Sequence, residues 1–354
     1  MPRHVGLFRC DGLLGISRFL RFFLPGPRHS APGGIPCKDN LAHMSELYPS
    51  AKHFLSRDFH SHSFSSEIPP ALKVQVGDQI HIQTWDCYKG QVTTNADLIK
   101  PIDDADVNPA TGPICIEGAE PGDTLTVKII DIKTETRGVA RFSPNEGQLH
   151  EKAKGPYGRF LTVTNDTIHL NEKVSFPLNP MLGVIGVAPE SGSILTMPAG
   201  KHGGNLDNNN NTIGSTIYLP VKHDGAFLGI GDMHASMGDG EICGTGVEIG
   251  GDVLIEVGLI KNITTNYPVT ETATSWITHG VANEDIQLAM KIACEEAADL
   301  LVKHWGFTYE DAFIFLSVAC DLGIAQNVHP CKGTVIAKLT VPKIKACPTP
   351  FNFI

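Results

Sequence analysis

From residue 70 onward the chain consists largely of short runs in which apolar and polar residues alternate, separated by Gly, Pro and Asp. Side chains in a strand point alternately to opposite faces, so this period of two predicts half-buried β-strands. In the first clear run, Ile80, Ile82, Thr84 and Asp86 fall on one face. The segments with this pattern are 76–86, 121–132 and 250–260.

An aspartate stands at the start of each of these runs: Asp78, Asp123 and Asp252. Aspartate favours turns because its carboxylate accepts hydrogen bonds from nearby backbone N–H groups. We therefore interpret these three residues as turn residues that precede strands, and we exclude them from the candidate site.

The apolar period changes from two to between three and four late in the chain, which predicts two helices joined by a short turn. We expect the first helix over residues 283–306, with Asn283 as its N-cap and Gly306 at its end, and the second over residues 308–323, with Thr308 as its N-cap. The apolar face predicted for the first helix comprises Ile286, Met290, Ala293, Ala297, Leu300 and His304. Residues 333–342 then return to a strand pattern.

These elements predict an α+β fold that is predominantly β, with strands of the sandwich or barrel type and a helical hairpin near the carboxyl end. We divide the chain into three regions: a leader (1–43), a β-rich body (44–282), and a helical pair with a final strand packed on that body (283–354). The 36 glycines and 24 prolines among 354 residues agree with many short strands and turns.

Charge and hydropathy exclude two classes of partner. The formal net charge is −10, which argues against binding to nucleic acid. No apolar run reaches the roughly 18–20 residues that a helix needs to span a bilayer, so we expect no membrane partner. The nine cysteines contain no Cys-x-x-Cys pair, which is typical of reduced thiols and predicts a cytoplasmic protein.

Residues 1–43 differ from the rest, because they carry five Arg and one Lys against two Asp. Spaced arginines within an apolar stretch are typical of an organellar transit peptide, so mitochondrial targeting is the alternative to a cytoplasmic location. A disordered leader, with Met44 as the functional start, is the other interpretation.

The stretch "GDMHASMGDGE" (231–241) holds one imidazole and three carboxylates and has no Lys or Arg. Asp232 and His234 are two residues apart after an apolar run, so they project to the same face of a strand. This spacing could offer an oxygen and a nitrogen ligand to zinc or a similar divalent metal, and Asp239 and Glu241 repeat it. The alternative is a solvated, capped loop.

A second polar stretch lies in "AGKHGGNLDNNNN" (199–211), which we expect to be a loop. His202 and Asp207 could join His234 at one metal. The backbone N–H groups of Gly203 and Gly204, with the side chain of Asn205, could bind an oxyanion. An Asn-rich surface turn is the alternative. Asp86 is a further metal candidate, because an aspartate on an inward face usually has a partner.

Five blocks of sequence resemble the acetamidase/formamidase family in order and spacing, from about Pro69 to Pro342. They are "GPICIEGAEPGDTLTVKIIDI", "PMLGVIGVAPESGS", "HGGNLD", "GSTIYLPV" and "GDMHASMGDGE". The resemblance implies a β-rich homo-oligomer with a late helical pair. It implies hydrolysis of the C–N bond of short aliphatic amides to a carboxylate and ammonia, and binding of a divalent metal.

Together these observations lead to the hypothesis of metal-assisted amide hydrolysis. The metal would be zinc, with calcium as the alternative, and its ligands would come from Asp86, His202, Asp207, Asp232 and His234. Glu241 or Asp239 would move the proton from water to the leaving ammonia. Gly203, Gly204 and Asn205 would stabilise the oxyanion, in a pocket tight enough to exclude larger acyl groups.

Two alternatives remain open at this stage. In the first, Cys243 or a carboxylate attacks the carbonyl and the metal is only structural; Cys87 and Cys243 are neighbours of the site rather than expected nucleophiles. In the second, the chain is a catalytically silent family member that binds small molecules or acts as a scaffold. Met237 keeps this second alternative open, because the family usually has Gln at that position.

Overall fold

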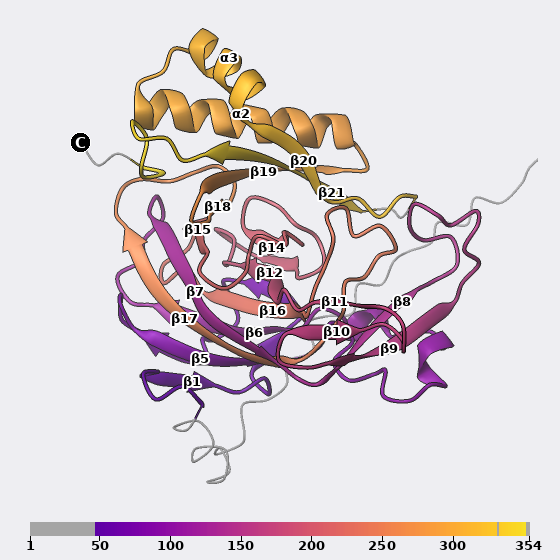
Figure 1. Ribbon diagram of the computed structural model, residues 1–354. Helices are drawn as coiled ribbons and strands as arrows, with labels where there is room; N and C mark the ends of the chain where they lie inside the picture. Colours follow the sequence, from indigo (N-terminus) through magenta and orange to yellow (C-terminus); the bar gives the residue numbers. More distant parts are fainter. Residues whose placement is uncertain (1–46, 331–332, 352–354) are drawn as a thin grey trace, which may run out of the picture.

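The computed structural model describes residues 47–330 and 333–351. Most of this part of the chain is strand or loop (Figure 1). The strands before residue 150 are β1 (His53–Leu55), β2 (His60–Ser61), β3 (Ser63–Ser65), β4 (Leu72–Val74), β5 (Gln79–Thr84), β6 (Ala110–Ile116), β7 (Thr124–Thr134) and β8 (Arg137–Phe142). Those in the middle are β9 (Tyr157–Val163), β10 (Thr167–His169), β11 (Ser175–Pro177), β12 (Met181–Gly186), β13 (Ser193–Leu195), β14 (Gly203–Asn205) and β15 (Thr216–Pro220). The late strands are β16 (Leu228–His234), β17 (Gly251–Ile260), β18 (Val269–Glu271), β19 (Ser275–Asn283), β20 (Asp321–Gln326) and β21 (Thr334–Pro342).

The strands form two large sheets and two small ones. The nine-stranded sheet has the order β1-β5-β17-β7-β15-β18-β19-β21-β20, and the six-stranded sheet has the order β14-β12-β16-β6-β2, with β4 also paired to β6. A four-stranded sheet (β11-β10-β9-β8) and the pair β13-β3 complete the set. The late strands thus continue the sheet that the early strands begin.

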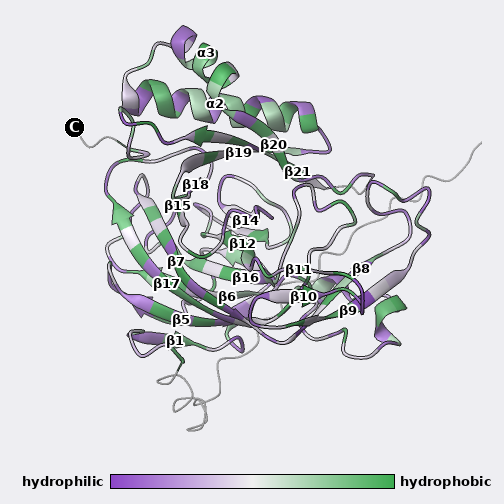
Figure 2. Cartoon of the chain, viewed as in Figure 1, coloured by the Kyte–Doolittle hydropathy of each residue, from purple (hydrophilic) through white to green (hydrophobic). Residues whose placement is uncertain are grey.

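The main hydrophobic core lies between the two large sheets. It joins Ile80 of β5, Val127 of β7 and Val253 of β17 to Leu182 of β12 and Ile230 of β16. Figure 2 shows the hydrophobic residues alternating with polar ones along the strands of the larger sheet. The prediction of a predominantly β protein with strands at the three alternating segments is confirmed.

Two helices, α2 (Ile286–Trp305) and α3 (Tyr309–Ala319), cover the end of the nine-stranded sheet (Figure 1). They form a second core with β19 and β21 that includes Trp276, Ala293, Leu301, Leu316 and Leu339. The predicted helical pair near the carboxyl end is therefore confirmed. Short 3₁₀ helices are present at Asp97–Ile99 and Asp104–Asp106.

The helix boundaries differ in part from the predicted ones. Gly306 ends α2 in the left-handed conformation and Thr308 caps α3, both as expected. The N-cap of α2 is Asp285 rather than Asn283, because Asn283 is the last residue of β19. The second helix ends at Ala319, earlier than predicted, because the residues from Asp321 onward pair with β21 as strand β20.

Two of the three aspartates interpreted as turn residues behave as predicted. Asp78 accepts a hydrogen bond from the backbone N–H of Gln75, and Asp123 accepts one from that of Glu120. Asp252 is different: it lies inside β17 (Gly251–Ile260), and its carboxylate is 2.6 Å from Nε2 of the buried His81 on the neighbouring strand.

The leader predicted for residues 1–43, with its cytoplasmic or mitochondrial alternatives, lies outside the described residues. Among the residues that the structure does describe, no helix has the length and apolar character required to cross a bilayer.

Candidate active site

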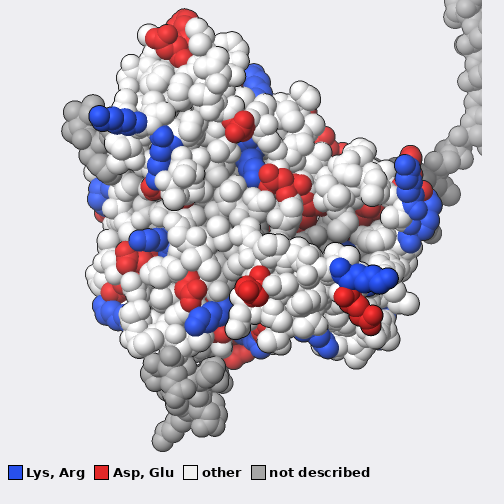
Figure 3. Space-filling model, in the orientation of Figure 1, with Lys and Arg blue, Asp and Glu red and all other residues white. Residues whose placement is uncertain are grey.

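A cavity of about 400 Å³ opens beside the carboxyl end of β16. Figure 3 shows acidic side chains gathered around a hollow on this face of the molecule. The acidic residues that line the cavity are Asp104, Glu146, Asp207, Asp232, Glu241 and Glu248. Arg141 also lines it, and its Nη2 donates a hydrogen bond to the carbonyl of Lys100.

Strand β16 brings Asp232 to the wall of this cavity and places His234 beside Asp232, as their spacing predicted. All seven residues of β16 are buried, because the strand lies in the middle of the six-stranded sheet. Nε2 of His234 lies 3.4 Å from Oδ1 of Asp232 and 4.0 Å from Oδ1 of Asp207. Asp207, which follows β14 directly, thus meets the β16 pair.

Glu241 joins the same group from the loop after β16. Its Oε2 accepts a hydrogen bond of 2.8 Å from Nε2 of Gln326, and the same nitrogen also donates to Oδ2 of Asp207. Gln326 is the last residue of β20, and backbone hydrogen bonds from Gly240 to Ala325 and from Asn327 to Gly240 attach the loop to this strand. The end of the late sheet therefore fixes the two carboxylates.

Glu248 and Cys87 complete the polar end of the cavity from two further loops. Oε2 of Glu248 lies 3.1 Å from Nε2 of His234, and both side chains are buried. Cys87 follows β5 and is also buried. Asn108 is beside them, and its Nδ2 donates to Oδ1 of Asn205 at 3.2 Å and to Oδ2 of Asp232 at 3.5 Å.

Four of these buried polar atoms have no hydrogen-bond partner and face one another. They are Oδ1 of Asp207, Oδ1 of Asp232, Nε2 of His234 and Oε2 of Glu248. Buried polar atoms in folded proteins are almost always paired, because an unpaired one costs about 1–3 kcal/mol. The four atoms therefore form a candidate binding site for a cation.

The pKa values of the group are shifted by burial and by the closeness of its carboxylates. Burial raises the pKa of Asp207, and the carboxylates of Glu241 and Asp232 raise it further. Burial likewise raises the pKa of Glu241, and it raises that of Glu248 to about 8 even though His234 opposes the change. Burial alone would lower the pKa of His234, but the carboxylates of Glu248 and Asp232 outweigh it and raise that pKa well above its usual value.

The backbone at the site is held in unusual conformations. Asp207, Asp232 and Glu241 have φ angles of 39°, 52° and 44°, in the left-handed region that non-glycine residues rarely occupy. Such conformations cost on the order of 1–3 kcal/mol each and are concentrated at functional sites. Gly183 of β12 provides the room, since a Cβ there would lie 2.5 Å from Oδ2 of Asp232 and equally close to Asp207.

Comparison with known proteins identifies the family. The model of the acetamidase/formamidase family matches residues 51–195 and 191–344. The chain belongs to the acetamidase/formamidase family. The crystal structure of a predicted acetamidase/formamidase of Thermoanaerobacter tengcongensis superposes with a TM-score of 0.79 at 39% identity, covering 82% of this chain and 96% of that one.

Two relatives within this family carry names for their activities. An acetamidase of Mycolicibacterium smegmatis is 28% identical over 72% of this chain and 84% of its own. A formamidase of Methylophilus methylotrophus is 27% identical over 80% of this chain and 86% of its own. The expectation of an amidase is thereby confirmed at the level of the acetamidase/formamidase family.

Two of the five candidate metal ligands lie away from the converging atoms. The carboxylate of Asp86 accepts hydrogen bonds from the backbone N–H groups of Tyr88 and Gly90 and so closes a turn. His202 is buried with its ring edge against Phe64 and its Nε2 unpaired, and burial lowers its pKa to about 4. Asp207, Asp232 and His234 are the candidates that the structure brings together.

Of the three residues expected to bind the oxyanion, only Asn205 lines the cavity. Gly203 and Gly204 form part of β14, which pairs with β12, so this part of the expected loop is a strand. Asn205 lines the cavity and is held by Asn108. Of the two candidate proton carriers, Glu241 is buried in the group, whereas Asp239 is half exposed and forms an ion pair with Lys338 at 2.5 Å.

Two other residues named from the sequence stand outside the cavity wall that the structure describes. Met237 is buried, and its carbonyl oxygen accepts a hydrogen bond from Asn209. The thiol of Cys243 points to the carbonyl of Thr245 at 3.6 Å.

Sequence reasoning missed Glu248 and Gln326, and it treated Cys87 only as a neighbour. A signal existed for Glu248, which is an acid between the buried apolar residues Val247 and Ile249. Gln326 had none, since it follows a segment whose helix was expected to run to residue 323. Cys87 comes close to Asp232 and Glu248 only because of the conformation of the loop after β5.

Proposed function

We propose that this member of the acetamidase/formamidase family hydrolyses the C–N bond of aliphatic amides to a carboxylate and ammonia, with a divalent metal held by Asp207, Asp232 and His234. The observation that carries this proposal is the convergence of Oδ1 of Asp207, Oδ1 of Asp232 and Nε2 of His234 without hydrogen-bond partners. The names of the two relatives, acetamidase and formamidase, support the reaction.

The donor set fits such an ion. Two carboxylate oxygens and one imidazole nitrogen are ligands that zinc accepts, and a catalytic zinc typically takes three protein ligands and keeps a fourth position open. The raised pKa values of Asp207 and Glu248 are consistent with this, since a cluster of buried carboxylates must hold either protons or a cation. A bound divalent metal polarises a carbonyl and lowers the pKa of water.

The residues of the chain then account for the proton transfers. Water adds its oxygen to the carbonyl carbon, the C–N bond breaks, and one water proton must reach the departing nitrogen. Glu241 would carry this proton on Oε1, because its Oε2 accepts a hydrogen bond from Gln326. The side-chain amide of Asn205, which Asn108 orients, is available to the developing oxyanion.

The volume of the cavity limits the size of the amide that it can hold. A volume of about 400 Å³ lies in the range of pockets that hold ligands much larger than formamide. The tight pocket expected for a short acyl group stays a prediction. We propose that the acyl group extends beyond acetyl into the apolar part of the cavity, along Ile102, Met197 and Val335.

The test is ammonia release from formamide, acetamide and a longer aliphatic amide, with protein as purified, stripped by chelator, and resupplied with Zn²⁺. We expect turnover that is lost on stripping, returns with Zn²⁺ and is greatest for the longer amide. Turnover that does not respond to the metal would contradict its role and transfer the chemistry to a side-chain nucleophile. No ammonia under any condition would contradict the reaction itself and favour the silent family member.

A matched pair of variants separates the two candidate proton carriers. Glu241→Gln should lower kcat by about 10²–10⁴-fold, the range for loss of general acid–base catalysis. Asp239→Asn should leave kcat near that of the unaltered protein, because Asp239 pairs with Lys338 outside the converging group. The reverse order of effects would assign the proton to Asp239.

A further inference from the structure

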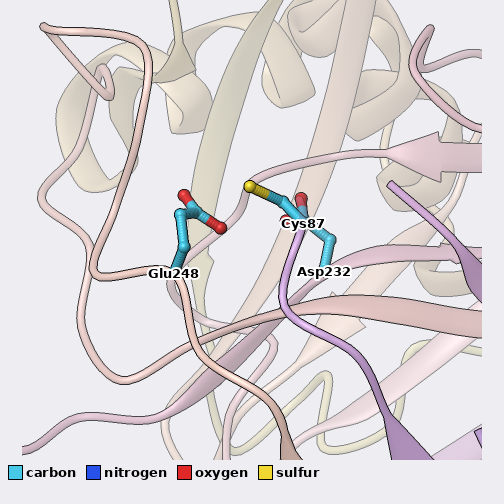
Figure 4. Close-up of side chains that lie close together, drawn as sticks. All are labelled: Cys87, Asp232 and Glu248. Carbon is cyan, nitrogen blue, oxygen red and sulfur yellow. The ribbon is translucent and has the colours of Figure 1, made fainter. Parts of the chain in front are cut away.

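Cys87, Asp232 and Glu248 form a second group of possible metal ligands beside the first. A sulfur or oxygen atom from each lies within 4.8 Å of the others, and all three residues are buried. Figure 4 shows the thiol of Cys87 and the carboxylates of Glu248 and Asp232 turned toward one another from three separate segments. A separate group with the same spacing consists of Asp207, His234 and Glu241.

One ion does not account for all of these side chains. Zinc takes four ligands in most protein sites, whereas the two groups together offer six side chains. Oε2 of Glu248 is buried and makes no hydrogen bond, and it contacts Nε2 of His234 at 3.1 Å, although the proposed ligands Asp207, Asp232 and His234 already provide one complete set. Four carboxyl groups and a thiol are buried here within reach of one another, and a single ion with four ligands would leave some of them without a partner.

We propose that Cys87, Asp232 and Glu248 hold a second divalent metal, next to the one held by Asp207, Asp232 and His234, with Asp232 as the ligand shared by both. This inference rests on the metal of the proposed function. The occupant is a thiophilic ion of the zinc type, because a thiolate together with carboxylates suits zinc and not magnesium or calcium. Paired ions bridged by protein ligands are a known arrangement in hydrolytic sites.

The environment of Cys87 favours a ligand over a nucleophile. Burial and the nearby carboxylates of Glu248 and Asp232 raise the pKa of its thiol well above the usual value, so the free thiol stays protonated and weakly nucleophilic. A coordinating metal removes that proton outright. An ordinary apolar role for Cys87 does not explain why two acidic side chains are turned toward it.

The first test is the metal content of the holoprotein after dialysis against Zn²⁺ and removal of the free ion. We expect two zinc ions per chain, and one in Cys87→Ala and in Glu248→Gln. The matched control is Cys243→Ala, which removes a thiol that donates a hydrogen bond to the carbonyl oxygen of Thr245. This variant should keep two zinc ions. If the unaltered protein holds one zinc ion per chain and Cys87→Ala holds one as well, the second metal site is overturned.

The second test replaces zinc by Co²⁺ in the unaltered protein, so it does not depend on how the variants fold. Thiolate coordination gives an intense sulfur-to-cobalt absorption in the near ultraviolet. We expect this band at the second equivalent of Co²⁺, and we expect it to survive in Cys243→Ala. Its absence would overturn Cys87 as a ligand. Its appearance at the first equivalent, with no second ion bound, would overturn the two-ion arrangement.

These readouts distinguish the two proposals. A chain that binds two ions, one of them through Cys87, but releases no ammonia would retain the second metal and contradict the proposed reaction. A chain that binds one ion and hydrolyses amides in a metal-dependent manner would support the proposed reaction and contradict the second metal.

Discussion

At the scale of single residues, the site depends on a glycine whose lack of a side chain leaves room for two carboxylates. Gly183 stands opposite both Asp207 and Asp232, where any Cβ would overlap their carboxylate oxygens. Those two aspartates also have positive φ angles, so their carboxylates are aimed by a backbone that the neighbouring strands hold in place. The positions of these two carboxylates are thus set by packing against β12.

We expect Gly183→Ala to lower kcat/KM by about 10²-fold, because a displacement of about 1 Å at a reacting group has an effect of that size. The added methyl group should also lower the free energy of unfolding by about 1–3 kcal/mol, as overpacking does in cores. Steady-state kinetics and urea unfolding measure the two effects. The control is Gly238→Ala, in the loop after β16, where a Cβ meets no atom within 4 Å. Equal effects in the two variants would contradict this account.

At the scale of elements, the alternation of apolar and polar residues predicted the strands of the large sheet correctly. The sequence pattern was less successful at the end of the second helix. Ile80, Ile82 and Thr84 are fully buried, as the period of two predicted. The second helix was extended too far because Gly323 was taken as its end, whereas Asp321 already begins a strand. The conformation of this strand is decided by pairing with β21, a contact between segments that no local pattern records.

The packing of α2 on the sheet depends on a close approach to β19. A Cβ at Gly280 would overlap the carbonyl oxygen of Ala289 in α2. We expect Gly280→Ala to push the helix outward and to lower the free energy of unfolding by about 1–3 kcal/mol. Gly323→Ala is the matched control, since a Cβ there meets only the side chain of Lys338, at 3.9 Å. Unfolding in urea checks both, and an unchanged midpoint for Gly280→Ala would show that the helix is not held so closely.

At the scale of the whole molecule, the sequence predicted the part of the site that is local and missed the part that is assembled. Asp232, His234 and Glu241 lie in one short sequence motif, and Asp207 lies in a second one. Gln326 reaches them only because β20 is added to the edge of the large sheet. The strand order, which brings these distant segments together, cannot be inferred from any single stretch of the chain.

The buried histidines predict how the stability of the whole molecule depends on pH. His279 is fully buried, its Nδ1–H donates to the carbonyl of Pro268, and its Nε2 accepts from Nδ2 of Asn208. Burial lowers the pKa of His279 to about 4. Because an unfolded histidine titrates near 6.5, the unfolded chain binds more protons between these two values, so stability must fall as the pH falls through this window.

We expect this one residue to lower the free energy of unfolding by about 3 kcal/mol in total between pH 7 and pH 4. Urea unfolding at several pH values measures the slope. His279→Gln should reduce it, and His169→Gln, which changes an exposed histidine, should not. A slope that is unchanged in His279→Gln would assign the effect to other groups.

The hydrogen bonds of Gln326 have a consequence for the time at which the protein becomes active. A ribosome releases Cys87, Asp207, Asp232 and Glu241 long before Gln326, so four of the groups exist while their last donor is still unmade. Until β20 and β21 emerge and join the sheet, the loop that carries Glu241 lacks the strand to which its backbone is attached. The nascent chain therefore lacks the complete group of side chains until its last two strands have been synthesised.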